Sequence, residues 1–186
     1  MEWPRAASDP PRMPIQTRRQ GGTKVDYVDG DGTVIATSKT YWRRNPLYPN
    51  PRVTIGRAVF EERLLGKRRN NHMRTPREVV NLETGERIFR IDGLNFDGEA
   101  RMVFEFGDSR RIHFPVQGTK SDPRMTAVDE ADSVLIRWRK IPHHHRIKAG
   151  DTEILISSED RPSVDLLLVM ATATPFLSFF FLRPGD

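Results

Sequence analysis

One long apolar run constrains the fold more than any other part of this sequence. Residues 163–182 read SVDLLLVMATATPFLSFFFL, whereas the rest of the chain is crowded with arginine. A helix of this length would be about 30 Å long, which matches the apolar core of a bilayer. The run is therefore either a C-terminal membrane anchor or the interior of a folded domain.

The start of this run has the features of a helix that is buried on every side. Asp160 or Ser163 can cap its N-terminus, and Asp165 suits the helix dipole. The leucine-rich residues that follow leave no polar face. Pro175 has no N–H to donate to the carbonyl of Ala171, which predicts that the helix ends there. We therefore expect a helix near 162–174 and a separate Phe-rich remainder, PFLSFFFL.

The chain before this run repeats one pattern: a short alternating stretch, a turn with Gly or Asp, and a second alternating stretch. Met102, Phe104 and Phe106 alternate with polar residues in this way, so one face is apolar and the other is wet. Gly and Asp tolerate the backbone angles that hairpin turns need. Five hairpins, or ten strands, are predicted, with turns at 29–32, 83–85, 107–109, 130–132 and 149–151.

Between the first two hairpins the pattern is less regular. Val59, Phe60, Arg63 and Leu64 have helical spacing, which predicts a short amphipathic helix near 57–65. So many short strands favour an antiparallel sandwich or barrel. The lumen of a ten- to twelve-stranded barrel is too wide for its own side chains to fill. A mostly β, closed antiparallel barrel of ten to twelve strands around the hydrophobic C-terminal helix is therefore one prediction, and the membrane anchor stays open as the other.

Length and composition fit a single domain. The chain has 186 residues and no cysteine, so its stability must come from packing and not from disulfides. Residues 1–21 contain several prolines and scattered charges, which predicts a disordered N-terminal lead, and residues 22–186 are expected to form the barrel. The 30 Lys and Arg residues exceed the 25 Asp and Glu residues, which favours acidic partners.

The order of these elements resembles the tubby C-terminal-like superfamily, which includes the LURP-one-related proteins and the phospholipid scramblases. The resemblance lies in the hairpin series followed by DTEILISSEDRPSVDLLLVMATATPF, and in the hairpin VVNLETGERIFRID. It covers roughly residues 22–182. It implies a twelve-stranded barrel closed around a C-terminal helix, and it therefore favours the buried helix over the membrane anchor. The scramblases' proline-rich and cysteine-rich segments have no counterpart here.

Three clusters of cations are the best candidates for a binding site. GKRRNNHMR holds several basic residues, and YWRRN and IRWRK each place cations beside a Trp, a combination that suits phosphate-rich surfaces. The tubby domain binds phosphoinositide headgroups in a basic pocket on its outside, so the resemblance implies an analogous patch. The expected contact residues are Arg43, Arg44, Lys67, Arg68, Arg69, Arg74, Arg137, Arg139 and Lys140. The alternative explanation is that these cations simply lie on solvent-exposed faces of strands and bind nothing.

No motif predicts catalysis or a cofactor. His143 and His145 would share one face of a strand, but no third ligand is evident, so a metal site is not expected. DYVDGDG lacks the ligand spacing of a calcium loop and is explained by a hairpin turn. A phosphate-binding glycine loop and a serine nucleophile elbow are both absent from the sequence.

The sequence therefore predicts a non-enzymatic binding module of unknown ligand, associated with anionic lipid through its basic clusters. A tail-anchored membrane protein with a cytosolic β-domain is one alternative. A β-domain that binds nucleic acid through its phosphates is another, less favoured one. No small-molecule substrate is inferred. The expected location is the cytoplasm, including its membrane surface.

Overall fold

The computed structural model describes residues 12–20, 24–39, 50–66, 75–95, 101–118, 123–140, 152–157 and 161–181. Within these ranges, side chains are described except at 12, 19, 93–95, 101, 115–118, 123–124, 139–140, 152 and 176–181.

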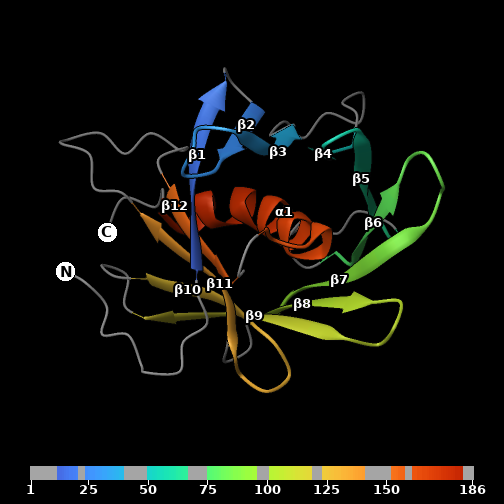
Figure 1. Ribbon diagram of the computed structural model, residues 1–186. Helices are drawn as coiled ribbons and strands as arrows, with labels where there is room; N and C mark the ends of the chain where they lie inside the picture. Colours follow the sequence, from blue (N-terminus) through green and yellow to red (C-terminus); the bar gives the residue numbers. More distant parts are fainter. Residues whose placement is uncertain are drawn as a thin grey trace.

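Twelve strands form one closed antiparallel barrel, and one helix follows them (Figure 1). Each strand pairs with its neighbours in the chain, and β1 pairs with β12 to close the ring. This confirms the predicted fold class. The elements are β1 (Arg12–Gln20), β2 (Lys24–Val28), β3 (Val34–Lys39), β4 (Arg52–Ile55), β5 (Ala58–Leu64), β6 (Arg77–Asn81), β7 (Arg87–Asn95), β8 (Arg101–Phe106), β9 (Arg111–Gly118), β10 (Pro123–Val128), β11 (Val134–Lys140), β12 (Thr152–Ser157) and α1 (Val164–Phe181).

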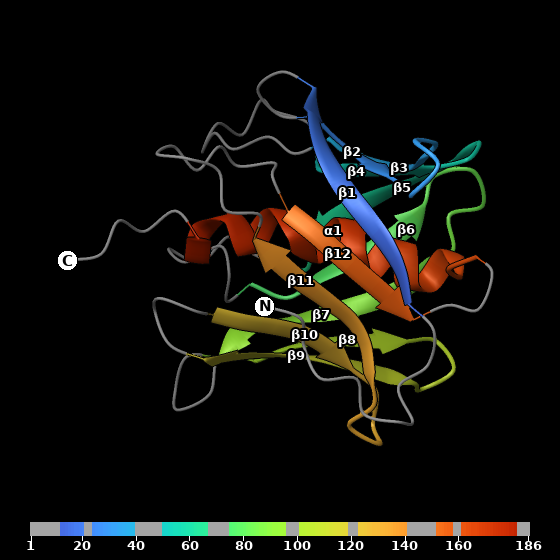
Figure 2. The ribbon, with the colours of Figure 1, turned by 60° about the vertical axis from the view of Figure 1, so that its left-hand side comes forward.

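The helix α1 lies inside the ring of strands and fills the lumen (Figures 1 and 2). Its residues 167–173 are all buried, and they share one core with the inward-facing side chains of the strands. The strands alternate as predicted: Met102, Phe104 and Phe106 all face this core, and Phe89 packs edge-on against the last two of them. The apolar run thus supplies the interior that so wide a barrel requires.

Four of the five predicted hairpin turns are present. They connect β2 to β3, β6 to β7, β8 to β9 and β10 to β11. In the first of them, the amide of Gly32 donates to the carbonyl of Asp29, and Gly32 has a positive φ of 85° that other residues adopt with strain. The turn expected at 149–151 lies outside the described residues. The fifth hairpin is nevertheless wrong, because both edges of β12 pair with other strands, β11 and β1, and not with the segment just before the turn.

The expected disordered lead is too long, because residues 12–20 form β1 and close the barrel. The inward-facing Ile15 and Thr17 are buried, as an alternating strand requires. Pro14 lacks an N–H, so it is disfavoured inside a sheet. It lies in the half of β1 that pairs only with β12, since pairing with β2 begins at Gln16.

The short helix expected near 57–65 is also wrong. This segment is β5, joined to β4 by a two-residue turn at Gly56 and Arg57. Phe60 faces the core while Glu61 faces outward and pairs with Arg52 on β4. The apolar residues of this segment have helical spacing, but the segment forms a strand because it can then pair with both β4 and β6.

The helix does not end at Pro175 but continues to Phe181. Pro175 has no N–H to donate to the carbonyl of Ala171. That carbonyl accepts a hydrogen bond of 3.2 Å from the buried hydroxyl of Tyr27 on β2 instead. The same hydroxyl lies 3.2 Å from Ser38 Oγ on β3. The barrel wall therefore supplies the donor that the helix lacks.

The barrel has two different ends. The hairpin end carries the turns that connect β2 to β3, β4 to β5, β6 to β7, β8 to β9 and β10 to β11, and α1 begins there. At the other end, which we call the basic end, β2 begins at Lys24, β3 ends at Lys39 and β4 begins at Arg52. Figure 2 shows α1 crossing the barrel lengthwise, with its last turns reaching past the ends of β11 and β12 at the basic end.

Candidate anionic-ligand surface

Three cations stand side by side on the outer face of the barrel at the basic end. Lys24 lies directly opposite Lys39 in the β2–β3 pair, and Lys39 lies directly opposite Arg52 in the β3–β4 pair. Neighbouring strands are about 4.8 Å apart, so these like charges are close together and repel one another. We call this row the basic rim. Such an arrangement disfavours folding, which suggests that it serves another purpose.

Carboxylates contact Lys24 and Arg52 of the basic rim. Lys24 Nζ lies 3.5 Å from Asp26, and Arg52 donates from Nε and Nη2 to one oxygen of Glu61, at 3.1 and 3.0 Å. Glu61 also accepts a hydrogen bond from Arg63. Burial raises the pKa of Glu61, but the hydrogen bonds from Arg63 and Arg52 outweigh it and hold that pKa below its ordinary value.

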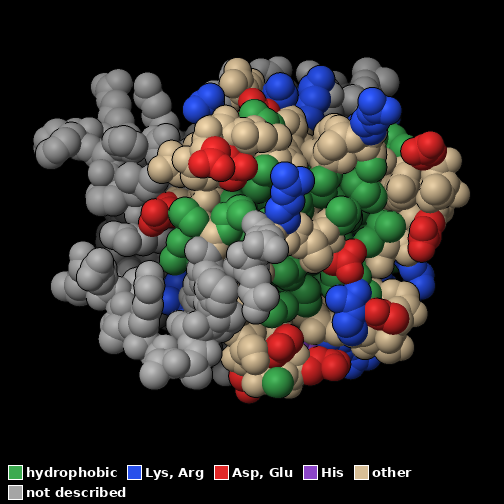
Figure 3. All heavy atoms as spheres, in the orientation of Figure 1, with side chains coloured by type: hydrophobic (Ala, Val, Ile, Leu, Met, Phe, Trp, Pro, Cys, Tyr) green, Lys and Arg blue, Asp and Glu red, His purple; other side chains and the backbone are tan. Residues whose placement is uncertain are grey.

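The outer face around the basic rim keeps a positive surplus. Among the outward-facing side chains described on β1 to β5, five cations stand against two carboxylates. Figure 3 shows several Lys and Arg side chains along the upper edge of the molecule, where β2 to β4 lie, with some Asp and Glu side chains among and below them. The cations are Arg18, Lys24, Lys39, Arg52 and Arg63, and the carboxylates are Asp26 and Glu61.

A second row of charged residues shows what a self-compensating arrangement looks like in the same sheet. It crosses five strands, and each residue lies directly opposite one of the other sign. This alternation stabilises the strand pairing, whereas the basic rim has no carboxylate between its members. The row consists of Arg63, Glu78, Arg90, Glu105 and Arg111.

Cations also mark the strand ends around the rest of the basic end. Of the twelve residues at which a strand begins or ends there, six are Lys or Arg and none is acidic. One of the six, Arg77, faces inward, is buried and forms an ion pair of 2.7 Å with Glu62. The positive character of this end is therefore not confined to three strands. The six are Lys24, Lys39, Arg52, Arg77, Arg101 and Lys140.

The residues predicted from the sequence are only partly described. Arg137 lies on the outer face of β11, opposite Leu155 of β12. The backbones of Arg139 and Lys140 form the last residues of β11, at the basic end. The remaining predicted contacts, Arg43, Arg44, Lys67, Arg68, Arg69 and Arg74, lie outside the described residues, as do His143 and His145.

Trp138 does not belong to a headgroup-binding surface, contrary to the interpretation of IRWRK. It faces the lumen, is 3% exposed and packs edge-on against Phe114. Its Nε1 donates a hydrogen bond of 2.9 Å to Thr174 Oγ1 on α1. The alternation of β11 separates it from its cationic neighbours, because Arg137 faces outward where Trp138 faces inward.

Sequence reasoning missed Lys24, Lys39 and Arg52. It searched for cations that cluster along the chain, whereas these three lie far apart in sequence and meet only through strand pairing. A partial signal was present: Lys24 lies five residues before the turn of the first predicted hairpin and Lys39 lies seven residues after it. The register shift between Tyr27 and Val28 places them directly opposite each other.

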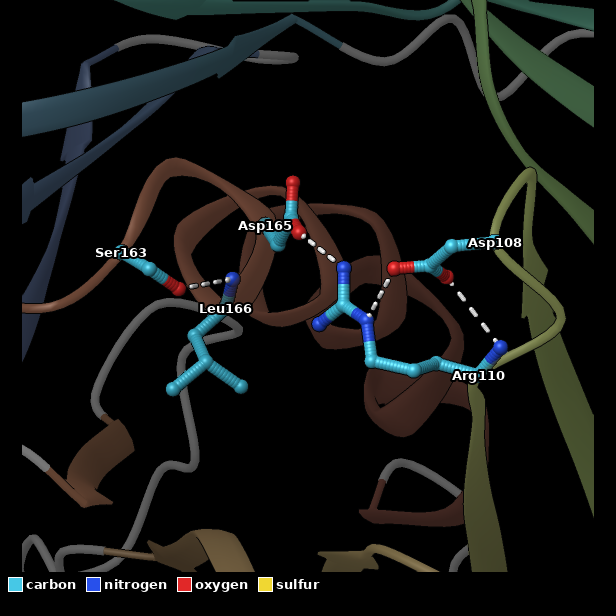
Figure 4. A network of polar contacts seen from close by, with 5 residues as sticks. All are labelled: Asp108, Arg110, Ser163, Asp165 and Leu166. Atoms are coloured by element: carbon cyan, nitrogen blue, oxygen red, sulfur yellow. Dashed lines mark hydrogen bonds and ion pairs between the residues drawn. The ribbon is translucent and has the colours of Figure 1, made fainter.

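At the hairpin end the charges pair with each other and hold the helix (Figure 4). Arg110, after the β8–β9 turn, donates to Asp108 at 2.6 Å and to Asp165 in the first turn of α1 at 2.8 Å. Its guanidinium also lies 4.7 Å from the centre of the Phe106 ring. Hydrogen bonds from Arg110 hold the pKa of Asp108 below its ordinary value. This network has a structural role and leaves no positive surplus.

Known proteins and chemical motifs add no further assignment. Comparison with protein families, with curated proteins and with solved structures finds no match. In the described part of the chain, no three His, Cys, Asp or Glu residues are grouped so that they could hold a metal ion. Nor does any helix there have the length and apolar character needed to cross a membrane. Membership of the tubby-like superfamily stays a prediction.

Proposed function

We propose that this protein is a non-enzymatic binding module that docks through the basic end of its barrel onto anionic lipid headgroups. The observation that carries the proposal is the basic rim, in which Lys24, Lys39 and Arg52 stand directly opposite one another without an intervening carboxylate. A phosphate-rich surface relieves the repulsion between them. The expected location is the cytoplasmic surface of a membrane.

The chemistry of the basic rim suits phosphate oxygens. Lysine offers a compact charge that attracts any nearby phosphate, and each such cation contributes about 1 kcal/mol of attraction to an anionic membrane. Arg52 keeps its guanidinium positioned through Glu61. Three adjacent cations thus favour a surface with many anionic headgroups over a single tightly bound ligand.

A lipid surface is favoured over nucleic acid by the position of α1. The helix ends at the same end of the barrel as the basic rim, and its last residues, 176–181, are almost entirely apolar. An apolar segment among cations fits the boundary between headgroups and acyl chains, which nucleic acid does not offer.

Vesicle sedimentation tests the proposal. The full chain is incubated with vesicles of phosphatidylcholine alone, or of phosphatidylcholine with phosphatidylserine or a phosphoinositide, over a series of salt concentrations. We expect binding only to the anionic vesicles, with a large loss as salt rises. Absence of binding to every anionic composition at low salt would overturn the proposal. So would equal or tighter binding to a DNA duplex at the same ionic strength.

A further inference from the structure

The end of α1 extends the barrel at its basic end. Residues 167–173 of the helix are buried, and the helical backbone continues for eight residues beyond Ala173 to Phe181. At about 1.5 Å per residue this continuation is roughly 12 Å long. Figure 2 shows the last turns of the helix reaching past the ends of β11 and β12.

The sequence of this continuation is apolar. Residues 176–181 read FLSFFF, with Ser178 as the only polar residue, and a leucine follows. Within the described side chains of α1, residues 167–173 are the ones that share the core with the strands. Leu64, the last residue of β5, adds a 42% exposed apolar side chain at the same end.

The cations and the apolar helix end are placed together by the topology. Lys24 begins β2, Lys39 ends β3 and Arg52 begins β4, so all three belong to the end of the barrel at which α1 finishes. Lys140 ends β11 at this end as well. Cations around an apolar segment complement a bilayer surface, which has anionic phosphates above an apolar layer.

We infer that the end of α1, residues 176–181, enters the interfacial layer of an anionic bilayer while the basic rim holds the headgroups around it. The inference rests on the proposed function and deepens it, because it fixes which end of the barrel faces the membrane and adds an apolar component to the binding. The partner is a lipid bilayer surface. The helix enters it from one side and the rest of α1 stays in the barrel.

A fluorescent probe at the helix end tests this orientation. The chain has no cysteine, so Phe180→Cys creates a unique site for a nitrobenzoxadiazole dye whose emission brightens in an apolar layer. The matched control is Ala131→Cys, in the exposed β10–β11 turn at the hairpin end. With phosphatidylserine vesicles we expect at least a twofold rise in emission at position 180 and no change at position 131. Lipids brominated on their acyl chains should quench the first dye only.

A second variant does not depend on the dye. Replacing Phe179, Phe180 and Phe181 with serine should weaken vesicle binding about tenfold. The binding that remains should be released completely by salt, because only the cations then contribute. Unchanged melting temperature shows that the barrel still holds its helix.

The outcomes separate the two proposals. Vesicle binding without brightening or quenching at position 180 overturns this orientation but leaves the proposed function standing. Loss of all vesicle binding by the unmodified chain overturns both. Brightening that occurs without vesicles and rises with protein concentration indicates contact between two copies of the chain, which also overturns the inference.

Discussion

The hydroxyl of Tyr27 donates a hydrogen bond to the main-chain carbonyl of Ala171, the one carbonyl in α1 that Pro175 cannot serve. Both groups are buried between the barrel wall and the helix. A buried carbonyl without a donor costs about 1 to 3 kcal/mol, so this contact explains why the helix passes through a proline without ending. It also ties the helix to β2 at a specific register.

A double-mutant cycle tests the link between these two features. Tyr27→Phe should lower the free energy of unfolding by about 1 to 2 kcal/mol, because it leaves the carbonyl without this donor. In a Pro175→Ala background the new amide can donate to the same carbonyl, so Tyr27→Phe should cost about 1 kcal/mol less. Denaturant unfolding of the four proteins measures the coupling. An equal cost of Tyr27→Phe in both backgrounds would show that the carbonyl does not depend on Tyr27.

The stability of the barrel should fall at high pH through the same residue. Burial raises the pKa of Tyr27 from 10.0 to about 12, although hydrogen bonds with Ser38 and Thr174 lower it in part. The unfolded chain therefore ionises first, and stability is full below pH 10 and decreases as pH rises from 10 to 12. The expected loss is about 2 to 3 kcal/mol. Unfolding measured against pH should show this loss in the wild type, and Tyr27→Phe should lack it.

The network of Arg110 with Asp108 and Asp165 at the hairpin end should contribute little to global stability. Arg110 and Asp165 are 56% and 33% exposed at their side chains, so Arg110→Ala should cost about 1 kcal/mol or less. Its effect should be local. Hydrogen exchange is expected to quicken in the first turn of α1, where Ser163 Oγ also accepts from the amide of Leu166. Equal loss of protection at the far end of α1 would contradict this local role.

Removal of the helix should abolish the fold. A chain that ends at residue 162 lacks the whole of α1, and with it the buried side chains of 167–173 that fill the lumen. We expect this truncated chain to be aggregated or unfolded by circular dichroism, while the full chain stays soluble. A soluble, folded barrel without α1 would show that the helix is dispensable for the core.

The sequence sufficed for the barrel and its filling. The turns at 29–32 and 130–132 have Gly32 and Asp132 where positive φ is needed, and a helix without a polar face can only be buried. Strand β1 was missed because prolines and charges mask its alternation, and its place depends on a distant partner, β12. Pairing between distant segments leaves no local signal, so the closure of the ring could not be read from the first 20 residues.

Two local patterns were misleading for related reasons. Val59, Phe60, Arg63 and Leu64 fit helical spacing as well as a strand, and only the strand partners of β5 decide between them. The break expected at Pro175 assumed that no outside donor exists, which Tyr27 contradicts. The candidate site could not be predicted for the same reason. The basic rim arises from the register of three paired strands and not from a run of cations in the sequence.

Charge reversal at the basic rim tests the central claim most directly. Lys24→Glu with Lys39→Glu is compared with Arg57→Glu and Arg87→Glu, two exposed cations at the hairpin end, so that both variants change the net charge equally. Their melting temperatures are checked first, and sedimentation with phosphatidylserine vesicles then gives the Kd. We predict that the first pair weakens binding at least tenfold at physiological salt, whereas the second pair changes it less than threefold. Equal weakening by the two pairs would contradict the account, because binding would then depend on net charge and not on the basic rim.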